Sequence, residues 1–176
     1  MRDDLQQEAC RHIAVMNRYA VALCRDPVQA DDLVQEALAR ALSGITGFRR
    51  GAPMLPWLLR ILHNVHVSHA RRRRNNEVGL DGHEDSVSEA PVAEQRVEGS
   101  ELLQLLWTLP ESQRAAVTLV CLDELTYAEA AGVLAIPKGT LTSRLARGRA
   151  ALRALVEAEA PPVSRARLRV IKGSGS

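Results

Sequence analysis

The stretch from Asn76 to Ser100 constrains the fold of this 176-residue chain more than any other feature, because it cannot contribute to a packed core. Residues 76–105 carry eight acidic side chains and one basic, whereas residues 1–75 carry 12 basic and 7 acidic and residues 106–176 carry 10 and 6. The stretch also contains glycines, serines and Pro91, and has too little apolar surface to offset the entropy of ordering it. We therefore predict two small domains, residues 1–75 and 101–157, joined by a flexible acidic linker at residues 76–100. A basic tail follows at residues 158–176, and its last residues resemble a cloning remnant.

Both domains are predicted to be all-α. Aromatic residues make up only 3% of the chain, whereas strands favour aromatic and β-branched residues. Apolar residues recur at helical spacing from the beginning, as at Ile13, Met16, Ala20 and Leu23. The start of the chain lacks the apolar core of a signal peptide, and no apolar run approaches the length of a membrane span. Three scattered cysteines (Cys10, Cys24 and Cys121) do not form a disulfide pattern, so we expect a reduced, cytoplasmic protein without membrane insertion.

A helix is predicted to begin at Asp26-Pro27, where Asp26 can cap and Pro27 suits the first helical position. It buries an apolar stripe that includes Leu33 and Val34. Its opposite side carries polar residues, namely Asp31, Asp32, Gln35 and Glu36. These residues indicate either a solvated helix surface or a docking surface for a basic partner.

A loop at residues 48–53 precedes a third helix, which we expect to begin near Pro56 and to end in four arginines, Arg71–Arg74. Cations suit a helix C-terminus, but four in a row exceed what capping needs, so contact with nucleic-acid phosphate is the preferred interpretation. His63, His66 and His69 could suggest a metal site. However, the direction of the side chains turns by roughly 120° over six helical residues, so three ligands would not converge, and no metal or cofactor is predicted.

The second domain has the pattern of a helix-turn-helix. Thr126 and Glu129 match a capping box at the start of a short helix, and Ala135-Ile136-Pro137 ends it. The next helix buries Leu141, Leu145 and Leu152. Ser143 and Arg147 point outward where such a helix reaches base edges, and Lys138, Arg144 and Arg149 flank them at positions typical of phosphate contacts. The alternative is a structural helical hairpin with a solvated arginine surface.

Taken in order, these motifs resemble bacterial RNA polymerase sigma factors of the extracytoplasmic-function type. The resemblance covers residues 10–156. It is carried by Ala30-Asp31-Asp32-Leu33-Val34-Gln35-Glu36, by Trp57–Asn64 with the arginine run, by Leu109-Pro110-Glu111-Ser112-Gln113-Arg114, by Leu125–Ala131, and by Pro137–Arg149.

The resemblance implies a function without catalysis: directing core polymerase to promoters. Docking on the polymerase clamp coiled coil would fall to Asp31, Asp32, Gln35 and Glu36, and the flap would be a further contact. The loop at residues 48–55 and Asn64 would capture a flipped base of the minus-ten element. The full set expected at that element is Phe48, Arg49, Arg50, Trp57, Arg60, Asn64, Arg71, Arg72, Arg73 and Arg74. The set expected at the minus-thirty-five element is Lys138, Thr140, Thr142, Ser143, Arg144, Arg147 and Arg149.

The resemblance also implies control by an anti-sigma factor that covers both domains. Three positions depart from the family pattern: Ser68 is often acidic, Ala146 is often larger, and Gly148 interrupts the predicted recognition helix at a cost of up to about 1 kcal/mol. Because of these three departures, the resemblance does not define the promoter sequence that the protein recognises.

Two other functions compete with this one. A repressor or activator that binds DNA alone would also use a helix-turn-helix, but it needs a dimerisation or ligand domain rather than an acidic docking helix. A small nuclease or metal hydrolase would use the histidines, although no carboxylate–histidine constellation supports it.

Overall fold

The computed structural model describes residues 2–49, 51–78 and 101–159. The predicted all-α class is confirmed for these residues, which form helices and the turns between them. The predicted linker at residues 76–100 lies almost entirely outside the described residues, as do Arg50 and the basic tail.

The N-terminal half consists of four α-helices and a short 3-10 turn. These are α1 (Arg2–Arg11), α2 (Ile13–Cys24), α3 (Pro27–Ser43), η1 (Ile45–Gly47) and α4 (Met54–Val78). Asp26 caps α3 as predicted, because its carboxylate accepts the backbone N–H groups of Val28 and Gln29 at 2.8 and 3.4 Å. Helix α4 begins two residues before the predicted start and runs past the four arginines to Val78.

The C-terminal half contains the predicted helix-turn-helix. Its elements are α5 (Glu101–Trp107), α6 (Glu111–Val117), the π-helical turn η2 (Thr118–Leu122), α7 (Tyr127–Leu134) and α8 (Lys138–Glu159). The capping box of α7 is confirmed: Thr126 Oγ1 accepts from the N–H of Glu129 at 3.3 Å, and the Glu129 carboxylate accepts from the N–H of Thr126 at 2.9 Å. Ala135 ends α7 in a left-handed conformation (φ 51°).

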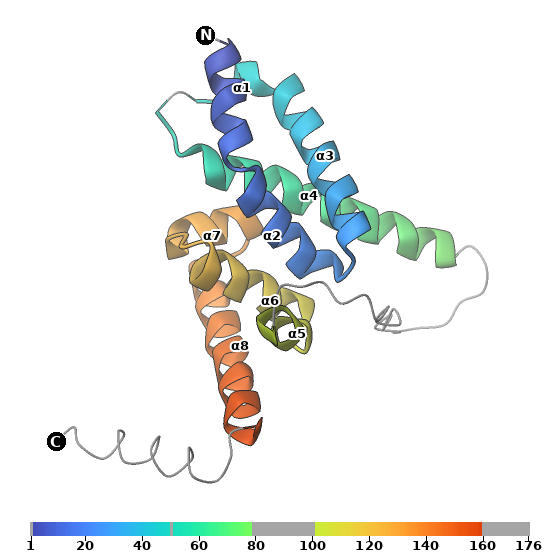
Figure 1. Ribbon diagram of the computed structural model, residues 1–176, viewed down its shortest axis with the longest axis vertical. Helices are drawn as coiled ribbons and strands as arrows, with labels where there is room; N and C mark the ends of the chain where they lie inside the picture. The colour runs from blue at the N-terminus through green and yellow to red at the C-terminus, as the bar shows by residue number, and fades with distance from the viewer. Residues whose placement is uncertain (1, 50, 79–100, 160–176) are drawn as a thin grey trace, which may run out of the picture.

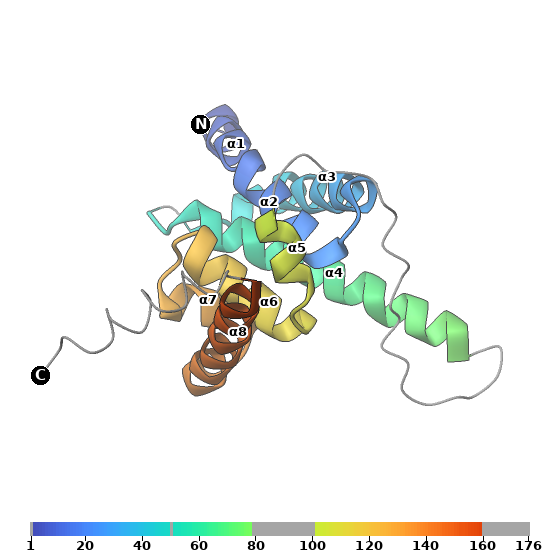
Figure 2. The ribbon, with the colours of Figure 1, turned by 60° about the horizontal axis from the view of Figure 1, so that its bottom comes forward.

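The two halves share one hydrophobic core, which the sequence did not indicate. Helix α7 packs on both α4 and α8, and α6 packs on α2 (Figures 1 and 2). Among the largest side chains of this core are Tyr19, Leu58 and Leu62 from the N-terminal half and Leu119 and Leu141 from the C-terminal half, each fully buried. The helix-turn-helix is therefore seated on the helix that carries the arginine run.

Candidate nucleic-acid interface

The acidic side of α3 is open to solvent at three of its four predicted positions. Asp31, Asp32 and Gln35 are exposed, whereas Glu36 is half-buried between α3 and α4. Glu36 accepts a hydrogen bond from Arg40 at 2.6 Å and lies 2.8 Å from Nε2 of His69. Glu36 therefore joins α3 to α4, and the freely accessible acidic surface is formed by the other three residues.

Helix α4 presents a line of exposed side chains at intervals of three and four residues. Arg60, Asn64, Val67, Arg71 and Arg74 are all exposed and recur at this spacing, so they lie along one side of the helix. The line extends over 15 residues, from Arg60 to Arg74, and so over about 21 Å along the helix axis. Of the other two arginines in the run, both are exposed, and Arg73 donates to Oε1 of Gln29 on α3 at 3.0 Å.

Val67 was not among the predicted site residues. It is 38% exposed and stands three residues beyond Asn64 on the same side of α4. Its spacing from Asn64 would have revealed it, but an isolated valine in a helical pattern is more naturally assigned to the core. An apolar side chain at this position can contact a base or a thymine methyl group.

Phe48 is largely buried, with 8% of its surface exposed. Its ring packs against half-buried Trp57, with ring centroids 4.9 Å apart and planes inclined by 54°. The pair holds the loop at residues 48–53 against the start of α4. Arg49 is exposed at the beginning of this loop, and Arg50 lies outside the described residues.

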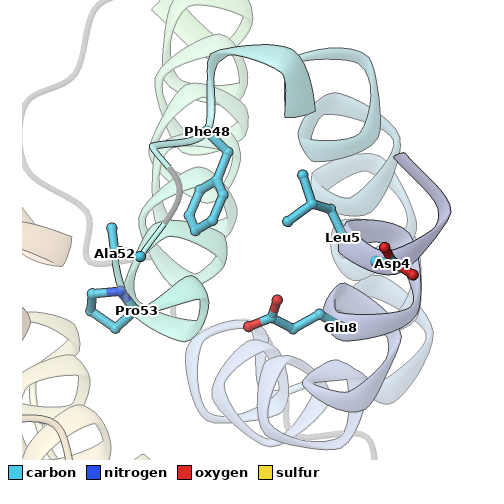
Figure 3. Close-up of a pocket in the computed structure, with 7 residues that line it drawn as sticks. Asp4, Leu5, Glu8, Phe48, Ala52 and Pro53 are labelled. Carbon is cyan, nitrogen blue, oxygen red and sulfur yellow. The ribbon is translucent and has the colours of Figure 1, made fainter. Parts of the chain in front are cut away.

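An open pocket of about 570 Å³ lies between this loop and α1 (Figure 3). Leu5 and Glu8 extend from α1 toward the Phe48 ring, and Ala52 and Pro53 form the opposite wall. The sequence placed the loop at a base-binding site but gave no indication that α1 would form a wall of it. The wall formed by Ala52 and Pro53 is apolar, and the wall formed by α1 carries the Glu8 carboxylate. A pocket of this kind can accommodate a flat group that has both apolar and polar edges.

The predicted recognition helix α8 exposes most of the expected residues. Lys138, Thr142, Arg147 and Arg149 are exposed, and Thr140, Ser143 and Arg144 are half-buried. The hydroxyl groups of Thr142 and Ser143 donate to the carbonyl groups of Lys138 and Thr140, both at 2.9 Å. Arg149 donates to the sulfur of Cys121 at 3.3 Å, which holds its guanidinium beside η2. Arg147 is exposed one turn beyond Ser143.

The three histidines of α4 have separate partners. Nδ1 of His63 shares a hydrogen bond of 3.0 Å with the hydroxyl of Tyr19, and Nε2 of His66 lies 2.9 Å from Oε1 of Glu111. His69 pairs with Glu36, as described above. The described residues contain no group of three histidine, cysteine or carboxylate side chains that could hold a metal ion.

These contacts shift the pKa values of two groups between the halves. Burial is the main cause that lowers the pKa of His63 from 6.5 to about 4, and the neighbouring His66 and Arg144 act in the same direction. The hydrogen bond from His66 lowers the pKa of Glu111.

None of the helices in residues 2–49, 51–78 and 101–159 is both long and apolar enough to span a membrane.

Comparison with known proteins places both halves in one family. The family models for sigma-70 region 2 and sigma-70 region 4 match residues 10–76 and 100–152. The ECF RNA polymerase sigma factor EcfG of Rhodopseudomonas palustris is 33% identical over 157 residues, which cover 89% of this chain and 87% of that protein. The ECF sigma factor SigC of Mycobacterium tuberculosis is 38% identical over 144 residues, covering 79% and 75%.

A solved structure has a similar arrangement of helices. The sigma factor RpoE of Bartonella quintana, crystallised with the anti-sigma factor NepR, superposes with a TM-score of 0.74 at 27% identity. The superposition covers 89% of this chain and 99% of the other, so it includes both halves.

Proposed function

Because the chain belongs to the extracytoplasmic-function class of RNA polymerase sigma factors, which direct core polymerase to promoters, we propose a division of this task among its three exposed surfaces. One observation carries the proposal. An acidic helix side on α3, a basic line on α4 and a basic recognition helix α8 are all exposed on one small helical chain.

The docking surface for core polymerase is the exposed part of the α3 side, formed by Asp31, Asp32 and Gln35. Glu36 contributes from its half-buried position, where it also holds α3 on α4. Carboxylates on a rigid helix suit a basic partner surface such as the clamp coiled coil, because complementary charge speeds and orients association. A second contact with the flap falls to the C-terminal half.

Minus-ten DNA binds along α4 and the loop before it. Arg60 and the run Arg71–Arg74 contact phosphate, which gives affinity without sequence preference. Asn64 and the loop that begins at Phe48 and Arg49 bind a base flipped from the non-template strand, and Arg50 belongs to the same loop. The Phe48–Trp57 pair supports this site, since Phe48 is buried and its ring packs against half-buried Trp57.

Minus-thirty-five DNA is read by α8 in the major groove. Arg147 is exposed and can make a bidentate contact with guanine, and Ser143 lies one turn before it on the same side. Lys138, Thr140, Thr142, Arg144 and Arg149 contact the backbone or adjacent edges.

The protein acts by binding, without catalysis of its own, and works in the cytoplasm, where polymerase and promoter DNA are found. We assign docking on core polymerase and binding of the minus-ten element to a domain of residues 1–75. Binding of the minus-thirty-five element is assigned to a domain of residues 101–157. An anti-sigma factor that contacts both halves controls it. The similar sigma factor of Bartonella quintana was crystallised in complex with an anti-sigma factor, which supports this part of the proposal.

Promoter-dependent run-off transcription with sigma-free core polymerase tests the proposal. The full chain should give a discrete product from its own promoters, and core polymerase alone should not. Genomic fragments serve as templates because the promoter sequence is open. Absence of any promoter-dependent product, in a preparation that binds core polymerase, would reject the assigned function. Sequence-specific binding to DNA without polymerase would instead favour a conventional repressor or activator.

A further inference from the structure

Helix α1 forms one side of the pocket beside Phe48, and packing fixes its position there. Ala9 is buried and Leu5, one turn before it, is half-buried, so this side of α1 faces η1 and α4, on which the helix packs. Glu8 follows Leu5 by three residues and is exposed. In Figure 3 the Glu8 side chain extends toward the loop, whereas the Asp4 carboxylate points away from it. A packed helix therefore holds one carboxylate at the pocket.

The opposite side of the pocket is formed by a loop whose shape depends on Gly51. Gly51 has a φ of 82°, in the left-handed region that favours glycine, and the N–H of Ala52 donates to the carbonyl of Arg49 at 3.1 Å. This turn places Ala52 and Pro53 opposite α1, with the Phe48 ring between the two walls. The loop thus supplies the apolar contacts of the pocket, and α1 supplies the charged one.

The pocket lies at one end of the exposed line of side chains on α4. Pro53 directly precedes α4, and Arg60 and Asn64 follow it by seven and eleven residues, so the three positions share one side. Arg60 is six residues beyond the start of α4, or about 9 Å along the helix axis. A DNA strand whose phosphates contact Arg60 can therefore place a neighbouring base at the pocket.

The charges around the pocket determine which part of a nucleotide enters it. Glu8 repels phosphate, whereas Arg49 on the loop and Arg60 on α4 are exposed and attract it. The neutral base is therefore the part that turns toward α1. An ionised carboxylate only accepts hydrogen bonds, and that of Glu8 has no hydrogen-bond or ion-pair partner within residues 2–49, 51–78 and 101–159. Glu8 is thus available to accept a hydrogen bond from the edge of a base.

We infer that Glu8 is a specificity-determining residue for the flipped base of the minus-ten element, and that it selects a base with an exocyclic amino group. Cytosine presents its N4 amino group as a donor where thymine presents the O4 acceptor. The two pyrimidines are similar in size, so hydrogen bonding rather than fit distinguishes them. Thymine would bring two acceptors together in the pocket, which leaves both unsatisfied.

The role of Glu8 rests on the proposed function, which brings the minus-ten strand to this pocket. The match to sigma-70 region 2 begins at residue 10, so it assigns no role to Glu8. The selection follows instead from the position of α1 opposite the loop.

Promoter fragments recovered by run-off transcription provide the test. The non-template strand is left unpaired over the minus-ten element, so that melting does not limit binding, and each position in turn carries cytosine or uracil. Uracil lacks the thymine methyl group, so the comparison changes only the hydrogen-bonding edge. Holoenzyme with the unaltered chain should bind cytosine about tenfold more tightly than uracil at one position, which corresponds to about 1.4 kcal/mol.

Glu8→Gln keeps the size of the side chain, but its amide can both donate and accept, so the preference for cytosine should fall to about twofold or less. Glu101→Gln is the matched control, because it removes the same charge from an exposed position at the start of α5, outside the pocket. It should keep the tenfold preference. Circular dichroism and binding of core polymerase without DNA should be the same for all three forms.

The outcomes separate Glu8 from the function on which its role rests. Promoter complexes with the same cytosine preference in Glu8→Gln and the unaltered chain would overturn the role of Glu8 and leave the proposed function intact. No cytosine preference at any position, or its equal loss in Glu101→Gln, would overturn it as well. Failure of every form to bind promoter DNA as holoenzyme would reject the proposed function and, with it, the selection by Glu8.

Discussion

Gly148 of α8 lies so close to Val117 of α6 that a Cβ atom on residue 148 would meet Cγ2 of Val117 at 2.7 Å. The sequence alone suggests that this glycine weakens the recognition helix. The structure shows instead that the missing side chain allows α8 to approach α6 closely.

Gly148→Ala should therefore destabilise the protein, although alanine is the better helix former. Val117 is buried and β-branched, so it cannot turn away without disturbing the core. We expect a loss of about 1–3 kcal/mol in the free energy of unfolding, partly offset by up to about 1 kcal/mol of helix propensity. Urea unfolding followed by circular dichroism measures the difference.

Gly132→Ala is the matched control. Gly132 lies within α7, and a Cβ atom there would have nothing within 4 Å. This substitution should stabilise the protein by about 0.5–1 kcal/mol. If both variants shift stability in the same direction, the close approach of α6 and α8 is not what selects glycine at position 148.

Asp32→Lys should weaken binding to core polymerase by about tenfold or more, or about 1.4 kcal/mol, because it places a like charge against a basic partner surface. Asp32 is exposed and lies outside the bonds between α3 and α4, so unfolding should be unaffected. Fluorescence anisotropy with labelled protein and core polymerase measures the affinity.

Glu36→Lys is the less clean version of this test, since it also breaks the contacts with Arg40 and His69. Glu8→Lys, an acidic-to-basic change on α1, is the control and should leave the affinity unchanged. Equal binding by Asp32→Lys and Glu8→Lys would remove the α3 side from the docking surface.

Arg147→Ala should weaken minus-thirty-five recognition by about 1–3 kcal/mol at one base pair and relax the preference there. Lys138→Ala should weaken binding about equally for all DNA sequences. It should also reduce the slope of the logarithm of the binding constant against the logarithm of the salt concentration by about one. Holoenzyme binding to promoter variants at two salt concentrations separates the two effects. A uniform loss for Arg147→Ala would assign this residue to phosphate instead.

Local structure was predictable where the signal lies within a few residues. The Asp26 cap, the Thr126–Glu129 capping box and the end of α7 at Ala135 follow from side-chain chemistry at fixed spacing. The exposed sides of α3, α4 and α8 follow from the spacing of their apolar residues. The exposed residues of α3, α4 and α8 could be identified because each set lies on a single helix, whereas their assignment to polymerase and DNA came from the family resemblance.

Contacts between distant segments were not predictable. Arg18 and Asp123 are separated by 105 positions, and the residues around each of them do not indicate that the two side chains pair. The contribution of α1 to the pocket beside Phe48, and the approach of Gly148 to Val117, depend on how helices cross. Helix crossing is set by side-chain packing over the whole core, which periodicity does not specify.

The depressed pKa of His63 makes stability depend on pH. Between the ordinary value of 6.5 and the folded value of about 4, the unfolded chain binds a proton that the folded chain does not. The contribution of His63 to stability should therefore be constant above about pH 6.5 and fall as the pH decreases toward 4, by at most about 3 kcal/mol. His63→Gln should remove this loss between about pH 6.5 and 5, while leaving the further loss at lower pH that follows from the lowered pKa of Glu111. Urea unfolding of both forms at a series of pH values tests this, and parallel pH profiles would show that His63 is not the titrating group.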